Sequence, residues 1–201
     1  MKIYEEFLGN KLPDGFYWFN EPARYHTGKG LELFTDANTD FWQKTHYGFS
    51  RDNGHCLFMK HAGDFCLETH VESKPVARYD QCGLMIRSDE KNWIKVSTEY
   101  ENEDVSRLGS VVTNSGYSDW ATRDIPSVRR EIWYRISRRG NDFLIESSFD
   151  GAEWSQMRIS HLHRADEILE IGIYACSPRG KGFSCRYVSL KIDDNAWFFI
   201  E

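Results

Sequence analysis

Polar and aromatic side chains alternate with apolar ones along two neighbouring segments, residues 81–88 and 92–99. One set of alternate positions holds Gln81, Arg87, Trp93, Lys95 and Glu99. Successive side chains of a β-strand point to opposite faces, so these five would project from one side of a sheet. An indole ring can stack on the apolar C–H face of a sugar, and charged side chains hydrogen-bond strongly to hydroxyl groups. The spacing therefore predicts a face that binds a carbohydrate or a sugar-like small molecule. The alternative is a solvated sheet face with cross-strand ion pairs of small energetic value.

Residues 114–120 add a second group of candidates, because they combine turn-forming residues with Tyr117, Asp119 and Trp120. Loops held by a rigid scaffold often carry binding residues. We expect these three side chains to border the predicted face, and Glu146 and Tyr174 to join it from other strands. The alternative is a structural loop in which Trp120 closes one end of the fold.

Three carboxylates follow one another at a period of two, at Glu99, Glu101 and Glu103. They resemble the acidic strand of sandwich-fold glycanases, in which a nucleophile and an acid of raised pKa lie about 5–5.5 Å apart. The usual spacing there is Glu-x-Asp-x-x-Glu, and we expect nothing apolar nearby to raise the pKa of one of these groups. A glycoside-acting enzyme is therefore an alternative for which we name no catalytic residue, and a solvated hairpin end is the simpler interpretation.

The sequence carries no pattern typical of a metal or cofactor site. His161 and His163 could offer two imidazoles from one strand face, but no Cys, Asp or Glu at a characteristic spacing joins them. Neither a G-x-S-x-G motif nor a glycine loop for phosphate is present. We expect no metal site and no cofactor.

The composition limits the partners. The net charge is −6, from 31 acidic and 25 basic residues, which argues against a nucleic-acid partner. No apolar run approaches the roughly 18 residues of a membrane span, and acidic residues stand where a signal peptide would be apolar. The five cysteines lie scattered in apolar contexts, as reduced thiols do. We expect a cytoplasmic protein that binds neither nucleic acid nor membrane. A protein partner stays open.

The elements that must position these residues are short strands. Alternating segments rich in Val, Ile, Phe, Tyr and Trp predict eleven strands, at residues 16–19, 31–35, 55–60, 64–71, 81–88, 92–99, 109–113, 132–138, 142–149, 168–176 and 183–192. Residues 36–45 and 158–166 could hold a short helical turn. Each central strand has one apolar face, such as Cys82, Leu84 and Ile86, and one mixed face. The sequence therefore predicts an all-β fold of two antiparallel sheets packed through their apolar faces, with residues 1–201 as a single domain.

Several runs carry a family resemblance when they are taken in order. They are YDQCGLMIR at 79–87, NWIK at 92–95, EY at 99–100, SVVT at 110–113, YSDW at 117–120 and ACSP at 175–178. The set resembles an uncharacterised family of concanavalin A-like domains, whose fungal members are called regulation of enolase protein. It is also similar to the sandwich domain that follows the catalytic domain in some bacterial xylosidases. The family usually has Ala where this chain has Cys82.

The resemblance implies a concanavalin A-like jelly-roll sandwich, and the predicted ligand would lie on its concave polar face. No catalytic residue comes with it, because the activity of the family is not established and a fold alone does not give a function. A regulatory module that binds another protein of central metabolism is the alternative that the fungal name suggests.

Overall fold

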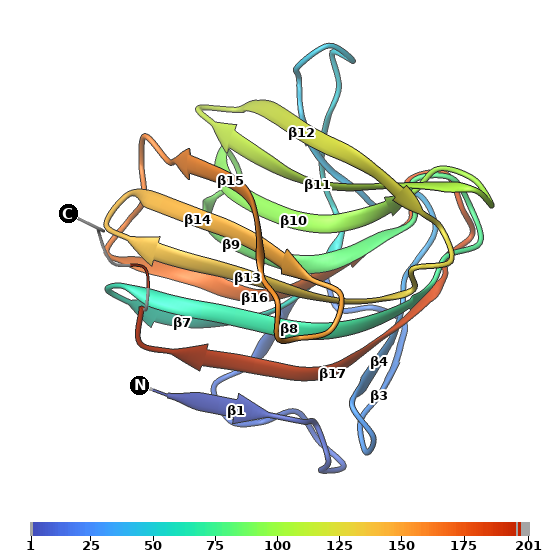
Figure 1. Cartoon of the computed structure of the whole chain (residues 1–201), viewed down its shortest axis with the longest axis horizontal. Helices are drawn as coiled ribbons and strands as arrows, with labels where there is room; N and C mark the ends of the chain where they lie inside the picture. Colours follow the sequence, from blue (N-terminus) through green and yellow to red (C-terminus); the bar gives the residue numbers. More distant parts are fainter. Residues whose placement is uncertain (1, 196, 198–201) are drawn as a thin grey trace.

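The computed structural model describes residues 2–195 and 197, and these residues form two large antiparallel sheets and no helix (Figure 1). One sheet has eight strands, in the order β15 (Ser155–His161), β14 (Asp142–Ser148), β13 (Glu131–Arg139), β8 (Phe65–Lys74), β17 (Ser184–Asp193), β4 (Leu31–Phe34) and β3 (Arg24–His26), with β1 (Ile3–Glu5) also paired to β17. The other has seven, in the order β12 (Tyr117–Pro126), β11 (Val105–Asn114), β10 (Asn92–Tyr100), β9 (Gln81–Asp89), β16 (Ile168–Cys176), β7 (His55–Ala62) and β2 (Tyr17–Phe19). The predicted jelly-roll sandwich is confirmed.

The core lies between the two sheets and follows the predicted alternation. Leu84 of β9 and Ile173 of β16 are fully buried in it, as are Leu67, Ile136 and Phe143 of the eight-stranded sheet. Each side chain of this size contributes about 1.5–3 kcal/mol when it is fully buried. This packing fixes which face of the seven-stranded sheet points away from the core, and we call that outer face the cleft face.

Residues 114–120 are not the loop that we expected. Ser115 and Gly116, with φ angles of 52° and 78°, form the turn, and β12 begins at Tyr117. Left-handed residues at both central positions are typical of a two-residue hairpin. In β12, Trp120 pairs with Val111 of β11. Residues 119–124 are exposed, so this outermost strand lacks the apolar alternation that would have revealed it.

The two segments that could have held a short helical turn contain strands instead. Residues 158–166 include the end of β15, and residues 36–45 include β5 (Phe41–Gln43), which pairs with β6 (Ser50–Asp52) in a small separate sheet. This β5–β6 hairpin packs on the cleft face, where Phe41 is buried. No helix long and apolar enough to cross a membrane is found among the described residues.

Candidate functional site

The β5–β6 hairpin covers part of the cleft face. Phe41 packs against Trp93 and Tyr174, with ring centroids 6.3 and 6.1 Å apart. Trp93 is fully buried, and its indole N–H donates to the backbone oxygen of Glu90 at 3.2 Å. The rest of this cluster consists of Cys56, Phe58, Met85, Val111 and Cys176. Trp93 does project from the predicted face, but the expectation that it is open to a ligand is wrong, because a hairpin distant in sequence covers it.

Beside this covered part, the cleft face forms an open cleft of about 500 Å³. Four of the predicted side chains line it, namely Gln81, Lys95, Glu99 and Trp120. The remaining lining comes from β10 to β12, the hairpin and the loops before β5, between β8 and β9, between β10 and β11 and after β16: Asn38, Asp40, Trp42, Tyr47, Phe49, Arg51, Arg78, Tyr79, Ser97, Glu101, Arg107, Gly109, Ser110, Val111, Thr122, Pro178 and Arg179. The structure thus brings part of the predicted set together and adds residues that the strand pattern did not indicate.

The floor of the cleft is a hydrogen-bonded network around Gln81. The Lys95 ammonium donates to the side-chain oxygen of Gln81 and to the backbone oxygen of Phe41, both at 2.9 Å. The Tyr174 hydroxyl donates to the same Gln81 oxygen at 3.0 Å, and the Gln81 amide donates to Glu99 at 2.8 Å. These bonds fix the orientation of the Gln81 amide. Tyr174 therefore supports the floor from below, and a ligand in the cleft would not touch it.

Glu99 is the most perturbed carboxyl group of the cleft. Burial is the main cause that raises its pKa; Lys95 and the hydrogen bond from Gln81 lower it, the carboxylates of Asp40 and Glu101 also raise it, and the resulting pKa is about 7. This finding contradicts the expectation that nothing near Glu99 would raise its pKa. The enclosure comes from the loops around the cleft, which the alternation along β10 does not reveal. Near neutral pH the group is present in both protonation states, as a general acid or a hydrogen-bond donor to a ligand requires.

We expect Glu99→Gln to flatten the pH dependence of stability. The ordinary pKa is 4.5 and the folded value is about 7, so the folded protein keeps the proton where the unfolded chain releases it. The resulting stabilisation is complete below pH 4.5 and is lost as the pH rises to about 7. Urea unfolding at acidic and mildly alkaline pH should show a difference smaller by about 3 kcal/mol in the variant. The exposed Glu103→Gln should keep the parent's pH dependence, and equal profiles for both variants would contradict this account.

Trp120 forms an exposed aromatic wall, with 37% of its surface accessible. The neighbouring strand makes room for it at Gly109, where an added Cβ would lie 3.1 Å from the indole nitrogen and 2.6 Å from the backbone oxygen of Ala121. A glycine within a strand often marks such a close approach. The indole is therefore held beside β11 while its ring stays accessible from the cleft.

The tip of the β5–β6 hairpin supplies a second aromatic wall. Tyr47 and Phe49 stack with ring centroids 5.8 Å apart, and Trp42 meets Tyr47 edge-on at 5.4 Å. Tyr47 and Phe49 are exposed. Sequence reasoning missed both, since they lie in a turn region without strand periodicity.

A buried carboxylate joins the two loops at the end of the cleft. Asp80 accepts hydrogen bonds from the backbone N–H groups of Val76 and Ala77, at 2.9 and 2.8 Å, and from the Ser177 hydroxyl at 2.5 Å. At Gly180 of the second loop, an added Cβ would lie 2.9 Å from the Cβ of Ala77 and 3.2 Å from the Asp80 carboxylate, so a larger residue there would push the two loops apart. Asp80 thereby positions the loop residues on both sides of it.

Tyr79 lies next to this anchor in an uncommon backbone conformation. Its φ angle is 76°, which is rare for a bulky residue and is found most often at functional sites. Its N–H donates to the backbone oxygen of Tyr100 at 2.7 Å. The guanidinium groups of Arg78 and Arg179 lie 4.7 and 4.9 Å from the centre of its ring. The strained turn thus gathers two cations at one aromatic side chain of the cleft.

Two predicted residues lie outside the cleft and have structural partners. Arg87 is buried under the hairpin, where it makes a bidentate ion pair with Asp52 at 2.7 and 2.8 Å and lies over the Phe19 ring. It anchors the hairpin to the sheet. The expectation that Glu146 joins the same face is wrong, because β14 belongs to the eight-stranded sheet, where Glu146 accepts a hydrogen bond from Arg135 at 2.8 Å.

Tyr117 and Asp119 do not line the cleft either. Asp119 alternates with Trp120 along β12 and so projects from the opposite side of the strand. Asp119 forms an ion pair with Arg158 at 3.0 Å, and Tyr117 is exposed at the hairpin end with the Lys44 ammonium 5.2 Å from its ring. The expectation that they border the binding face fails because the segment is a strand rather than a loop.

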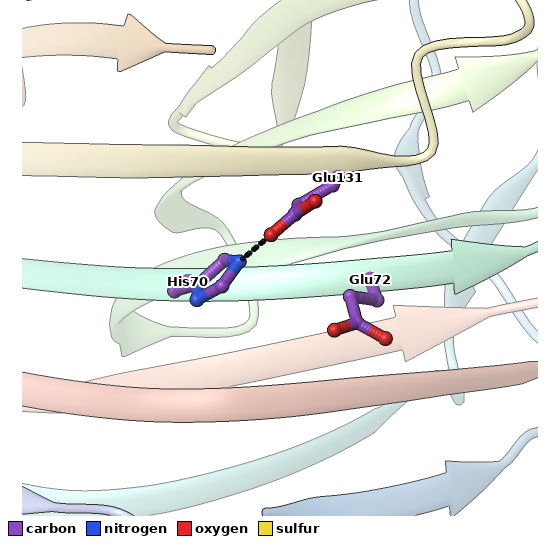
Figure 2. A group of neighbouring side chains, drawn as sticks. All are labelled: His70, Glu72 and Glu131. Atoms are coloured by element: carbon purple, nitrogen blue, oxygen red, sulfur yellow. Dashed lines mark hydrogen bonds and ion pairs between the residues drawn. The ribbon is translucent and has the colours of Figure 1, made fainter. Parts of the chain in front are cut away.

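His70, Glu72 and Glu131 form another group of polar side chains, on the outside of the eight-stranded sheet (Figure 2). Their ligand atoms lie within 4.8 Å of one another, as a metal site would require. His70 contacts Glu131 at 2.8 Å, whereas both oxygens of Glu72 accept hydrogen bonds from Arg186, at 2.6 and 2.7 Å. These contacts account for the group, and we assign no metal site to it.

Comparisons with known proteins agree with the fold. The family model described as Protein of unknown function (DUF1349) matches residues 18–195. Regulation of enolase protein 1 from Saccharomyces cerevisiae (strain ATCC 204508 / S288c) is 33% identical over 171 residues, which cover 85% of each chain. A solved structure of a functionally unknown S. cerevisiae protein is 29% identical, with a TM-score of 0.78 over 89% of this chain and 93% of that one. The GH43 protein BlXynB from Bacillus licheniformis has a TM-score of 0.75 at 13% identity, over 95% of this chain and 39% of its own, which is a likeness of fold alone.

Proposed function

Because this chain belongs to the family described as Protein of unknown function (DUF1349), which brings no activity with it, we propose a function from the cleft itself: the binding of a carbohydrate or sugar-like small molecule. The observation that carries the proposal is an open cleft of about 500 Å³ in which accessible aromatic rings face a fixed polar floor. Small-molecule pockets usually measure about 300–1,000 Å³.

The cleft has an apolar and a polar surface, which match the apolar C–H faces and the hydroxyl groups of a sugar. The exposed ring of Trp120 offers a flat apolar face for sugar C–H groups. Glu99 and Lys95, which flank the Gln81 amide, can exchange hydrogen bonds with hydroxyl groups. Since the Gln81 network already holds the floor in place, little conformational entropy would be lost when a ligand binds.

We expect Trp120→Ala to weaken sugar binding about tenfold, or ~1.4 kcal/mol, because it removes the aromatic wall. Isothermal titration calorimetry with a panel of neutral, carboxylated and phosphorylated sugars would measure the loss. Trp154→Ala is the matched control and should bind as the parent does, because Trp154 lies in the connection before β15 and its ring packs on Arg135 of β13. Failure of every sugar to bind, or equal affinity in Trp120→Ala and the parent, would refute the proposal.

A regulatory protein–protein interaction module is the second candidate. It is favoured by the stacked, exposed rings of Tyr47 and Phe49 on the hairpin, and by the name of the relative that is called Regulation of enolase protein 1. Exposed aromatic residues are typical of the centres of protein interfaces. A protein partner would bury the hairpin tip, whereas a sugar would lie deeper, against Trp120 and the Gln81 network.

A further inference from the structure

We infer that the ligand of this cleft carries a negatively charged group, a carboxylate or a phosphate, in addition to its hydroxyls. This inference rests on the proposed function and narrows its ligand class. The side chains that line the cleft include five cations, although the whole chain has a net charge of −6. Only three lining residues are acidic, Asp40, Glu99 and Glu101. The cleft is therefore a positive region on an acidic protein, and such a field concentrates anionic ligands.

Three of the five cations already have partners. Arg78 forms an ion pair with Glu101, and Arg107 forms one with Asp124 at 2.6 Å. Lys95 is held by the floor network. The charged groups of these three side chains therefore already have partners within the protein.

Arg51 and Arg179 differ from the other three. Within residues 2–195 and 197, neither guanidinium has a hydrogen bond or a carboxylate partner. Both are exposed at the cleft, Arg51 from β6 and Arg179 from the loop that follows β16. A guanidinium presents a planar fork that binds a carboxylate or a phosphate through two parallel hydrogen bonds. The guanidinium groups of Arg51 and Arg179 are therefore available to bind a carboxylate or a phosphate of a ligand.

Contacts with the neighbouring loop hold Arg179 in position. Its guanidinium lies 4.9 Å from the centre of the Tyr79 ring, and the Arg78 guanidinium lies 4.7 Å from the centre of the same ring. The loop that carries Arg179 is tied to the Tyr79 turn by the buried hydrogen bond that Ser177 donates to Asp80. A cation held this way loses little freedom when it binds an anion.

Glu99, at the floor of the cleft, also supports the inference. Because burial raises its pKa to about 7, its carboxyl is partly neutral at physiological pH. This reduces the negative charge that an anionic ligand would meet and leaves a proton for donation to it.

Calorimetric titration of the full chain with glucose, glucuronate and glucose-6-phosphate tests the inference at low and high salt. We expect at least one charged sugar to bind about tenfold more tightly than glucose, with an advantage that shrinks as salt screens the cations. The comparison of glucuronate with glucose-6-phosphate identifies the anionic group. Arg179→Gln should remove about tenfold of the charged sugar's affinity and leave glucose unchanged. Arg123→Gln is the matched control, since it removes the same charge from the opposite side of β12.

The outcomes separate this inference from the proposed function. Equal affinity for glucose and both charged sugars would overturn the inference and leave sugar binding intact. Binding of inorganic phosphate alone, lost in Arg179→Gln, would support the anion site and refute the sugar. No binding of any probe would overturn both, and equal losses in Arg179→Gln and Arg123→Gln would overturn the role given to Arg179.

Discussion

Trp93→Ala is expected to lower the free energy of unfolding by about 3–5 kcal/mol, the range for removing a large aromatic side chain from a core. Trp93 is fully buried, and Phe41 of the β5–β6 hairpin packs on it. The substitution leaves a cavity beneath the hairpin, and it also removes the indole donor to the backbone oxygen of Glu90. Urea unfolding monitored by circular dichroism measures the change.

Trp120→Ala is the matched control, because it removes the same residue type from the same face of the same sheet. Trp120 is exposed and fills no core, so we expect a change within about 1 kcal/mol. A Trp93→Ala variant that is as stable as the parent but fails to bind a sugar would place the ligand in the part of the face that we describe as covered.

Asp80→Ala is the second substitution expected to have a large effect, with a loss of about 3 kcal/mol or more. It removes the acceptor of three buried hydrogen bonds, from the backbone of Val76 and Ala77 and from the Ser177 hydroxyl. Bonds to a charged group contribute about 1.5–3 kcal/mol each, and buried donors left without an acceptor add their desolvation cost. The loops that carry Tyr79 and Arg179 should loosen, so ligand affinity should fall together with stability.

The control for this substitution is Asp119→Ala. Asp119 forms an ion pair with Arg158 on the surface, and exposed pairs contribute about 1 kcal/mol or less. We expect unfolding of this variant close to the parent's. If Asp80→Ala unfolded at the same urea concentration as Asp119→Ala, Asp80 would not be the anchor of the two loops.

The fold could be predicted from the sequence because its signal is local. Leu84 of β9 and Ile173 of β16 mark buried faces through strict alternation, and both lie in the core. The same alternation placed Gln81, Lys95 and Glu99 on one outer face, where they do line the cleft. Residue types at a period of two carry this information without any knowledge of the neighbouring strands.

The parts of the site that escaped prediction depend on contacts between distant segments. Nothing in residues 81–99 indicates that Phe41 covers Trp93, or that Asp52 holds Arg87. Glu146 was misplaced because alternation gives the face of a strand but not the sheet to which the strand belongs. Arg51 and Arg179 lie in a short strand and in a loop, where no periodicity marks a functional side chain.

The measurement that tests the cleft most directly is fluorine NMR of the protein labelled with fluorotryptophan, with signals assigned through Trp120→Phe and Trp93→Phe. As the tightest-binding sugar of the panel is added, the Trp120 signal should shift in a saturable way. The signals of buried Trp93 and of Trp154, which lies beside the other sheet against Arg135, should stay in place. A Trp120 signal that does not move at saturating sugar, or a saturable shift at Trp154 instead, would contradict a ligand site in this cleft.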